Sequence, residues 1–207
     1  MAQTFPIDLV LLVADKDIEQ TVAGLCARHD ALGVRPFSYQ IFVHPERDPG
    51  CLLQGVEFLR SFQQRYAYAM ILFDRMGSGR ENNSRLELEA MLESSLTGAG
   101  WTERAVAIVL DPELEAWVWS DSPHVAQILG WQGRTPALRI WLTEQGFFRG
   151  DEAKPEQPKE AMEAAIRSAR IARSSSLYRQ LAARVTLSRC TDASFLKFKS
   201  TLQRWFR

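Results

Sequence analysis

Apolar residues gather in four short segments of the first part of the chain, separated by polar and glycine-containing stretches. The segments have the length of strands and lie at 7–14, 38–44, 68–73 and 105–110. The first is almost continuously apolar, as expected of a strand that is buried on both faces of a parallel sheet. We therefore predict four strands in this part of the chain.

The stretches between the strands carry apolar residues three and four positions apart, which is the spacing of a helix with one buried face. Helices are expected at 18–29, 51–64 and 84–96, and the last opens with a capping box formed by Ser84 and Glu87. The Pro-Glu-Arg-Asp-Pro-Gly stretch at 45–50 is predicted to be a turn. Strands that alternate with helices in this way predict an α/β protein with a mainly parallel, Rossmann-like sheet flanked by helices.

After Asp111 the pattern predicts helices only, at 113–119, 124–129, 137–144, 158–172, 176–184 and 192–206. Two of them should carry proline at the first helical position, Pro123 behind Ser122 and Pro136 behind Thr135. We expect an α/β body over residues 1–120 and a helical extension over residues 121–207 that packs on it.

The composition of the chain predicts the cellular compartment of the protein. Its longest apolar run is far too short to cross a bilayer, so we expect no membrane association. The first residues lack the features of a secretory signal. The three cysteines are widely spaced and odd in number, which fits free thiols in a reducing compartment. These observations predict a cytoplasmic protein.

Charge is uneven along a chain whose net charge is zero. Residues 151–207 contain twelve Lys and Arg against six Asp and Glu, a net charge of +6, and residues 1–150 have a net charge of −6. A basic part on an acidic body is typical of proteins that bind phosphates or nucleic acid. A solvated helical surface has the same composition, and the charge alone leaves both interpretations open.

Acidic residues follow three of the four predicted strands. They are Asp15 and Asp17, then Asp74, then Asp111, Glu113 and Glu115. Ligands of parallel sheets bind beyond the carboxyl ends of the strands, and carboxylates that meet there repel one another unless a divalent cation or a shared proton offsets the repulsion. The alternative is that each acid caps a helix or opens a turn.

Two acid-ended strands, the first leading into a helix and the second into a glycine loop, resemble the TOPRIM domain, and four motifs carry a nearer resemblance to small TOPRIM-like proteins. The motifs are Val-Ala-Asp-Lys-Asp-Ile-Glu at 13–19, Leu-Phe-Asp-Arg-Met-Gly-Ser-Gly at 72–79, Pro-Glu-Leu-Glu-Ala-Trp-Val-Trp-Ser-Asp at 112–121 and Lys-Pro-Glu-Gln-Pro-Lys at 154–159. Together they are similar to small TOPRIM-like proteins of prokaryotic defence loci, including a small component of the methylation-associated anti-phage defence system. The resemblance implies a TOPRIM-like sheet and an antiviral role.

The resemblance also implies a metal site for Mg²⁺ or Mn²⁺, held by Asp15, Asp74 and Glu115, with Glu19 as a base or a supporting group. Glu113 and Glu115 would point about 200° apart on a helix, and Glu115 belongs to the more distinctive motif, so it is the predicted ligand. A bound cation would polarise a phosphoryl oxygen and activate a water for phosphodiester hydrolysis.

The chain departs from the family pattern at three positions. Asp15 stands where the family has glutamate, Lys16 where it has glycine, and Met76 where it has a second aspartate. A missing ligand weakens strand cleavage by two metals, and the Lys16 ammonium could neutralise the acids without any metal. Two functions follow: a degenerate TOPRIM-like site that binds or hydrolyses nucleic acid, and a non-catalytic adaptor that binds other subunits of a defence complex.

Basic and aromatic residues of the helical part supply the remaining candidates. A phosphate-binding set is predicted at Lys154, Lys159, Arg170 and Arg173. Trp117, Trp119, Trp131 and Trp141 could stack on bases, but a tryptophan at such positions more often packs in a core. Trp117 and Trp119 cannot both face inward on one helix, so one of them is expected to line a cleft.

Overall fold

Four parallel strands form one sheet in the computed structural model, which describes residues 4–120, 122–150, 152 and 154–207. The strands run in the order β2-β1-β3-β4 and comprise β1 (Ile7–Val13), β2 (Tyr39–Val43), β3 (Tyr66–Asp74) and β4 (Ala105–Leu110). Leu12 of the central strand β1 lies opposite Phe42 of β2 and Ile71 of β3. Residues Leu9–Val13 are fully buried, which explains the continuous apolar run.

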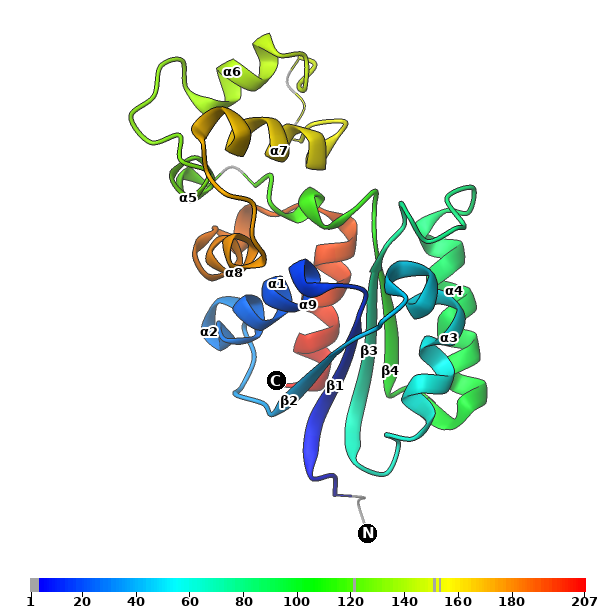
Figure 1. Ribbon diagram of the computed structural model, residues 1–207. Coiled ribbons are helices and arrows are strands. Elements are labelled where there is room, and N and C mark those ends of the chain that lie inside the picture. Colours follow the sequence, from blue (N-terminus) through cyan, green and yellow to red (C-terminus); the bar gives the residue numbers. More distant parts are fainter. Residues whose placement is uncertain (1–3, 121, 151, 153) are drawn as a thin grey trace.

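Helices cover both faces of the sheet, and the strand order decides which helix covers which face. The first four are α1 (Lys16–Cys26), α2 (His29–Leu32), α3 (Arg47–Arg60) and α4 (Arg85–Leu96). The connection from β1 to β2 runs one way along the sheet, and the connections from β2 to β3 and from β3 to β4 run the other way. Right-handed crossovers therefore place α1 on one face and α3 and α4 on the opposite face, as Figure 1 shows.

The reversal of direction between β1 and β3 creates a switch point, where the loops at the carboxyl ends of the two strands diverge. The predicted α/β fold with helices on both faces is confirmed, and the sheet is entirely parallel.

The helical carboxyl-terminal part is confirmed as well. It contains the helices α5 (Pro123–Ile128), α6 (Leu138–Glu144), α7 (Pro158–Ala169), α8 (Ser175–Arg184) and α9 (Ala193–Trp205), and the 3₁₀ turns η2 (Leu114–Trp117) and η3 (Leu187–Arg189). In Figure 1 α5, α6 and α7 form a lobe beyond the carboxyl ends of the strands, which we call the helical lobe. Helix α8 packs on α1, and α9 packs on β4 and covers the face of the sheet that α1 shares.

The chain therefore returns to the α/β body after the helical lobe. The domain boundary predicted at residue 120 stays a prediction. Helix α9 lies beyond this boundary in sequence and still contributes to the core of the body. Among the described residues no helix combines the length and apolar character that crossing a bilayer requires.

Three predicted element boundaries are wrong. Helix α3 begins at Arg47 and not at residue 51, so the proline–glycine stretch predicted as a turn forms its first turn. Gly50 is required there, because a Cβ at this position would lie 2.0 Å from Nδ1 of His44. Pro136 precedes the first residues of α6 and is not inside it. The helix expected at 113–119 is only the short turn η2.

The contact between α1 and α8 depends on a glycine. A Cβ at Gly24 would lie 2.8 Å from Cβ of Ala182 and 3.0 Å from the carbonyl oxygen of Arg179, so the two helices approach as closely as their backbones allow. Helix α1 leaves the carboxyl end of β1, and α8 is thereby fixed over the same edge of the sheet.

We expect Gly24→Ala to destabilise the protein by about 1–3 kcal/mol, because the added methyl group forces α1 and α8 apart. A drop in melting temperature of about 2–4 °C per kcal/mol would report this change. The matched control is Gly98→Ala, where nothing lies within 4 Å of the new Cβ. Equal melting temperatures for the two variants would show that α8 adjusts without cost.

Candidate functional site

Asp74 is the most strongly affected member of a group of buried and half-buried carboxylates at the carboxyl ends of the strands. It is the last residue of β3 and is 9% exposed. Its Oδ1 accepts a hydrogen bond from the backbone N–H of Leu114 at 2.9 Å, and its own N–H donates to Oδ1 of Asp48 at 2.8 Å. These two bonds join β3 to the segment after β4 and to the first turn of α3.

Burial raises the pKa of Asp74 well above the usual range of a carboxyl group, and the neighbouring carboxylates raise it further. Asp74 and those neighbours form what we call the carboxylate cluster, which consists of Asp15, Asp48, Asp74, Glu113 and Glu115. Burial also raises the pKa of Asp48 and of Glu115. A proton on Asp74 therefore lowers the repulsion within the cluster.

Two cations from the helical part offset the remaining negative charge. Nζ of Lys159, in the first turn of α7, lies 3.1 Å from Oε2 of Glu113. Burial alone would lower the pKa of Lys159, but the charge of Glu113 and the hydrogen bond to it raise the pKa overall. Arg173, just before α8, lies 3.2 Å from Oδ2 of Asp17 and 3.9 Å from Oε1 of Glu115.

Helix α8 contributes hydrogen-bond donors to the same site. The hydroxyl of Tyr178 donates to Oε1 of Glu115 at 2.5 Å, and the hydroxyl of Ser175 donates to Oδ1 of Asp17 at 2.5 Å. Tyr178 is 2% exposed, and burial raises the pKa of its hydroxyl, so the hydroxyl keeps its proton and acts as a donor. The contact of α8 with α1 therefore determines where both donors lie.

An open cleft of about 520 Å³ lies beside the cluster, and we call it the strand-end cleft. Its lining residues come from the carboxyl ends of β1 and β2 and from the starts of α1, α7 and α8. They include the acids Asp15 and Asp17 and the basic residues Lys16, Arg47, Lys159 and Arg173. Both signs of charge therefore face one cavity, together with the N-terminal ends of α1 and α8, which favour anions.

The three predicted metal ligands are near enough for the charges of Asp15 and Glu115 to raise the pKa of Asp74. Asp15 is also the N-cap of α1, and its Oδ1 accepts from the N–H groups of Asp17 and Ile18. The capping interpretation and the cluster interpretation of Asp15 therefore both apply. Since one carboxylate oxygen serves the cap, the other is available to the cluster.

The other predicted residues divide between the cleft and distant positions. Lys159 and Arg173 line the strand-end cleft, whereas Nζ of Lys154 lies 2.8 Å from Oδ2 of Asp192 at the start of α9. Arg170 is exposed and ends α7 in the left-handed conformation. Glu19 lies 2.7 Å from Nζ of Lys16. Lys16 is therefore paired with Glu19. The acids of the site are instead paired with Lys159 and Arg173, and not with Lys16 as the metal-free alternative supposed.

Three residues of the site were missed from the sequence. Asp48 lies in the stretch that was predicted as a turn, although it also follows a strand and so carries the same signal as the other acids. Glu113 was set aside on the assumption of a helix, but its backbone is extended, and Glu113 and Glu115 both contribute to the field at Asp74. Tyr178 has no local signal, because only the packing of α8 brings it to Glu115.

Trp117 and Trp119 are both buried, and Trp119 also lines a cavity of the helical lobe, as was expected of one of the two. Turn η2 ends at Trp117, which frees Trp119 from the helical spacing. Nε1 of Trp117 donates to the hydroxyl of Ser194 in α9, and Nε1 of Trp119 donates to the carbonyl of Pro158, both at 2.8 Å. The two rings therefore attach η2 to α9 and to the start of α7.

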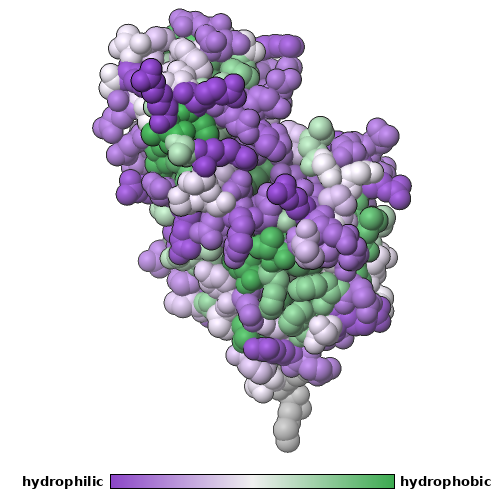
Figure 2. Space-filling view, in the orientation of Figure 1, coloured by the Kyte–Doolittle hydropathy of each residue, from purple (hydrophilic) through white to green (hydrophobic). Residues whose placement is uncertain are grey.

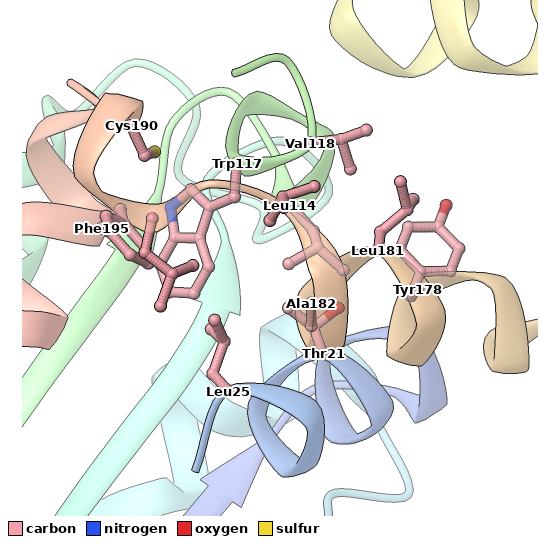
Figure 3. Close-up of a pocket in the computed structure, with 12 residues that line it drawn as sticks. Thr21, Leu25, Leu114, Trp117, Val118, Tyr178, Leu181, Ala182, Cys190 and Phe195 are labelled. Atoms are coloured by element: carbon pink, nitrogen blue, oxygen red, sulfur yellow. The ribbon is translucent and has the colours of Figure 1, made fainter. Parts of the chain in front are cut away.

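Behind the cluster lies a small apolar cavity of about 30 Å³, drawn in Figure 3. Leu25 and Thr21 of α1, Trp117 of η2 and Phe195 of α9 point towards it. This space suffices for one or two waters, and the buried hydroxyl of Thr21 has no hydrogen-bond partner within the described part of the chain. The cavity is too small for a substrate, and the candidate site is the strand-end cleft because it lies beside the carboxylate cluster.

No three His, Cys, Asp or Glu side chains within residues 4–120, 122–150, 152 and 154–207 are arranged to hold a metal ion as they stand. Asp121, the last residue of the third sequence motif, lies outside the described residues. Comparison of the chain with protein-family models, with curated proteins and with solved structures gave no match. The functional argument therefore rests on the residues and their geometry.

Asp74 should make stability fall as the pH rises. A carboxyl group whose pKa is raised by folding contributes stability while it is protonated, and this contribution is lost as the pH rises from about 4 through the raised pKa. In EDTA we expect the melting temperature to fall between pH 5 and pH 8. Asp74→Asn keeps the acceptor for Leu114 and should flatten this dependence. At pH 8 it should raise the melting temperature by about 2–4 °C for each kcal/mol of charge repulsion that it removes.

Asp111→Asn is the control, because Asp111 also follows a strand but is exposed and pairs with Arg75. It should change stability by about 1 kcal/mol or less. Equal destabilisation by Asp74→Asn at every pH would mean that Asp74 is ionised in the folded protein.

Proposed function

We propose that the strand-end cleft binds a phosphodiester together with Mg²⁺ or Mn²⁺. The observation that supports this proposal is the grouping of four carboxylates around the buried Asp74, two of them buried and two half-buried, next to a cleft that also carries four basic side chains. Buried acids that repel one another favour a divalent cation, and the basic residues favour an anionic ligand.

The donor chemistry of the cluster fits such a cation. Carboxylate oxygens are the ligands that Mg²⁺ prefers, and Mg²⁺ usually keeps several waters and uses only one or two protein carboxylates. The hydrogen bonds described above use Oδ1 of Asp15, of Asp48 and of Asp74. We propose Asp15, Asp74 and Glu115 as the ligands, with Asp48 supporting Asp74.

Lys159 and Arg173 would pair with the acids of the site first and with the phosphodiester after a cation has bound. Without a cation, Lys159 and Arg173 neutralise Glu113, Asp17 and Glu115. When a cation takes over that role, the two side chains become available to the oxygens of a phosphodiester. Cation and phosphodiester should therefore bind cooperatively.

Hydrolysis is the reaction that this arrangement would support. A bound divalent cation polarises a phosphoryl oxygen and lowers the pKa of a bound water. Glu19, which pairs with Lys16 of the cleft lining, stays the proposed base. We propose a prokaryotic antiviral defence system as the biological setting, and its support is the resemblance of the sequence motifs to TOPRIM-like proteins.

A second candidate function is a non-catalytic adaptor in a defence complex. The observation that favours it is internal neutralisation, because Lys159 and Arg173 already pair with the acids of the site. In that case the cluster is a structural feature, and partner proteins bind elsewhere on the surface.

Titration with Mg²⁺ or Mn²⁺ separates the two functions. A cation at one hundred times its dissociation constant stabilises the folded protein by about 2.7 kcal/mol, which is a rise in melting temperature of about 5–10 °C. The rise should be lost in Asp74→Asn and kept in Asp111→Asn. An unchanged melting temperature for the wild-type protein would favour the adaptor.

Hydrolysis is tested on single-stranded and double-stranded DNA and on RNA, each with Mg²⁺ and with Mn²⁺. Asp74→Ala should lower the rate by at least about 100-fold, because even residues that only support metal ligands cost 10–100-fold. Lys159→Ala should raise the KM more than it lowers the kcat. Equal activity in wild type and Asp74→Ala, or none in either, would remove the hydrolytic function and leave binding to be judged by the melting experiment.

A further inference from the structure

A second cavity, of about 550 Å³, lies in the helical lobe and shares no lining residue with the strand-end cleft. We call it the lobe pocket. It is bounded by the residues after η2, by α5 and α6, and by the segment that follows η3. Its size is within the range of about 300–1,000 Å³ that is typical of sites for small organic ligands. Figure 2 shows apolar surface on this lobe, surrounded by polar side chains.

The wall of the lobe pocket is apolar and includes two aromatic rings. Trp119 and Phe148 lie edge to face with ring centres 6.2 Å apart, and Leu138 and Leu142 of α6 complete the wall opposite Val125 of α5. All five side chains are at least nine-tenths buried. The Nε1 group of Trp119 already donates to Pro158, so this ring is held in place before any ligand arrives. Such a wall suits an aromatic ring or an acyl chain of a ligand.

The polar groups of the lobe pocket select the charge of the ligand. Arg139 and Arg189 line it, and no Asp or Glu is among its lining residues in the described part of the chain. The guanidinium of Arg139 lies over the ring of Phe148, 4.4 Å from its centre, and so carries a positive charge along the apolar wall. The hydroxyl oxygen of Ser120 is a buried lining atom without a hydrogen-bond partner among the described residues.

We propose that the lobe pocket binds a small organic anion whose apolar body packs on Trp119 and Phe148 and whose anionic group pairs with Arg139. A buried hydroxyl without a partner costs free energy, and a polar atom of the ligand would satisfy Ser120. This site is independent of the function proposed for the strand-end cleft, because the two cavities are lined by different residues.

Anilinonaphthalene sulfonate is a suitable probe, since it joins an aromatic body to one negative charge, and phenylnaphthylamine is its uncharged counterpart. Fluorescence titration of the full chain should give at least about tenfold tighter binding of the sulfonate, a difference of about 1.4 kcal/mol. Arg139→Gln should remove most of this preference and leave the binding of phenylnaphthylamine within about twofold. Ala126→Phe, which fills the pocket from α5, should weaken both dyes.

Two controls locate the bound dye. Arg134→Gln removes an exposed cation of the same lobe that does not line the pocket, and Arg173→Gln removes a cation of the strand-end cleft. Both variants should bind the sulfonate as the wild type does. Equal affinities in Arg139→Gln and Arg134→Gln, or a loss with Arg173→Gln, would overturn the proposal. Arg139 is exposed, so its variant should fold even if Ala126→Phe does not, and the melting temperature of each variant is measured first.

Discussion

Repulsion among buried carboxylates is the constraint on which the rest of the site depends. A parallel sheet directs the carboxyl ends of its strands to one edge, and in this chain acids lie at or after the ends of all four strands. Burial makes their repulsion stronger, because the surrounding protein screens charge far less than water does. The fold can retain such a group only if protons, cations or metal ions offset it, and the helical part of the chain is arranged to supply part of that compensation.

The compensation comes from elements that are far from the strands in sequence. Lys159 at the start of α7 and Arg173 before α8 reach the acids, and Tyr178 donates a hydrogen bond from within α8. Their positions depend on two contacts: the close approach of α8 to Gly24 in α1, and the hydrogen bond from Trp119 to the start of α7. The helical extension is therefore part of the site. A change in the packing of α8 would alter the charge balance around Asp74 without touching a carboxylate.

Much of the fold and part of the site could be predicted from the sequence. The strands are visible because a segment buried on both faces must be apolar throughout, and the parallel sheet follows from their alternation with helices. Asp15 and Asp74 were found because their positions directly after strands are local signals. Glu113 was missed because the choice between a helix and a short 3₁₀ turn depends on contacts with α7 and α9, and Tyr178 was missed because no spacing along the chain connects it to Glu115.

By itself, the sequence determined the layers of the fold and the acidic edge of the sheet, because both follow from periodicity and from the order of elements along the chain. Only the tertiary structure decided which acids share one field, which cations oppose them and which cavities remain open. These properties are sums over distances between residues that are remote in sequence, such as Asp17 and Arg173. A local pattern carries no information about such distances, whereas the packing of α1 against α8 determines them.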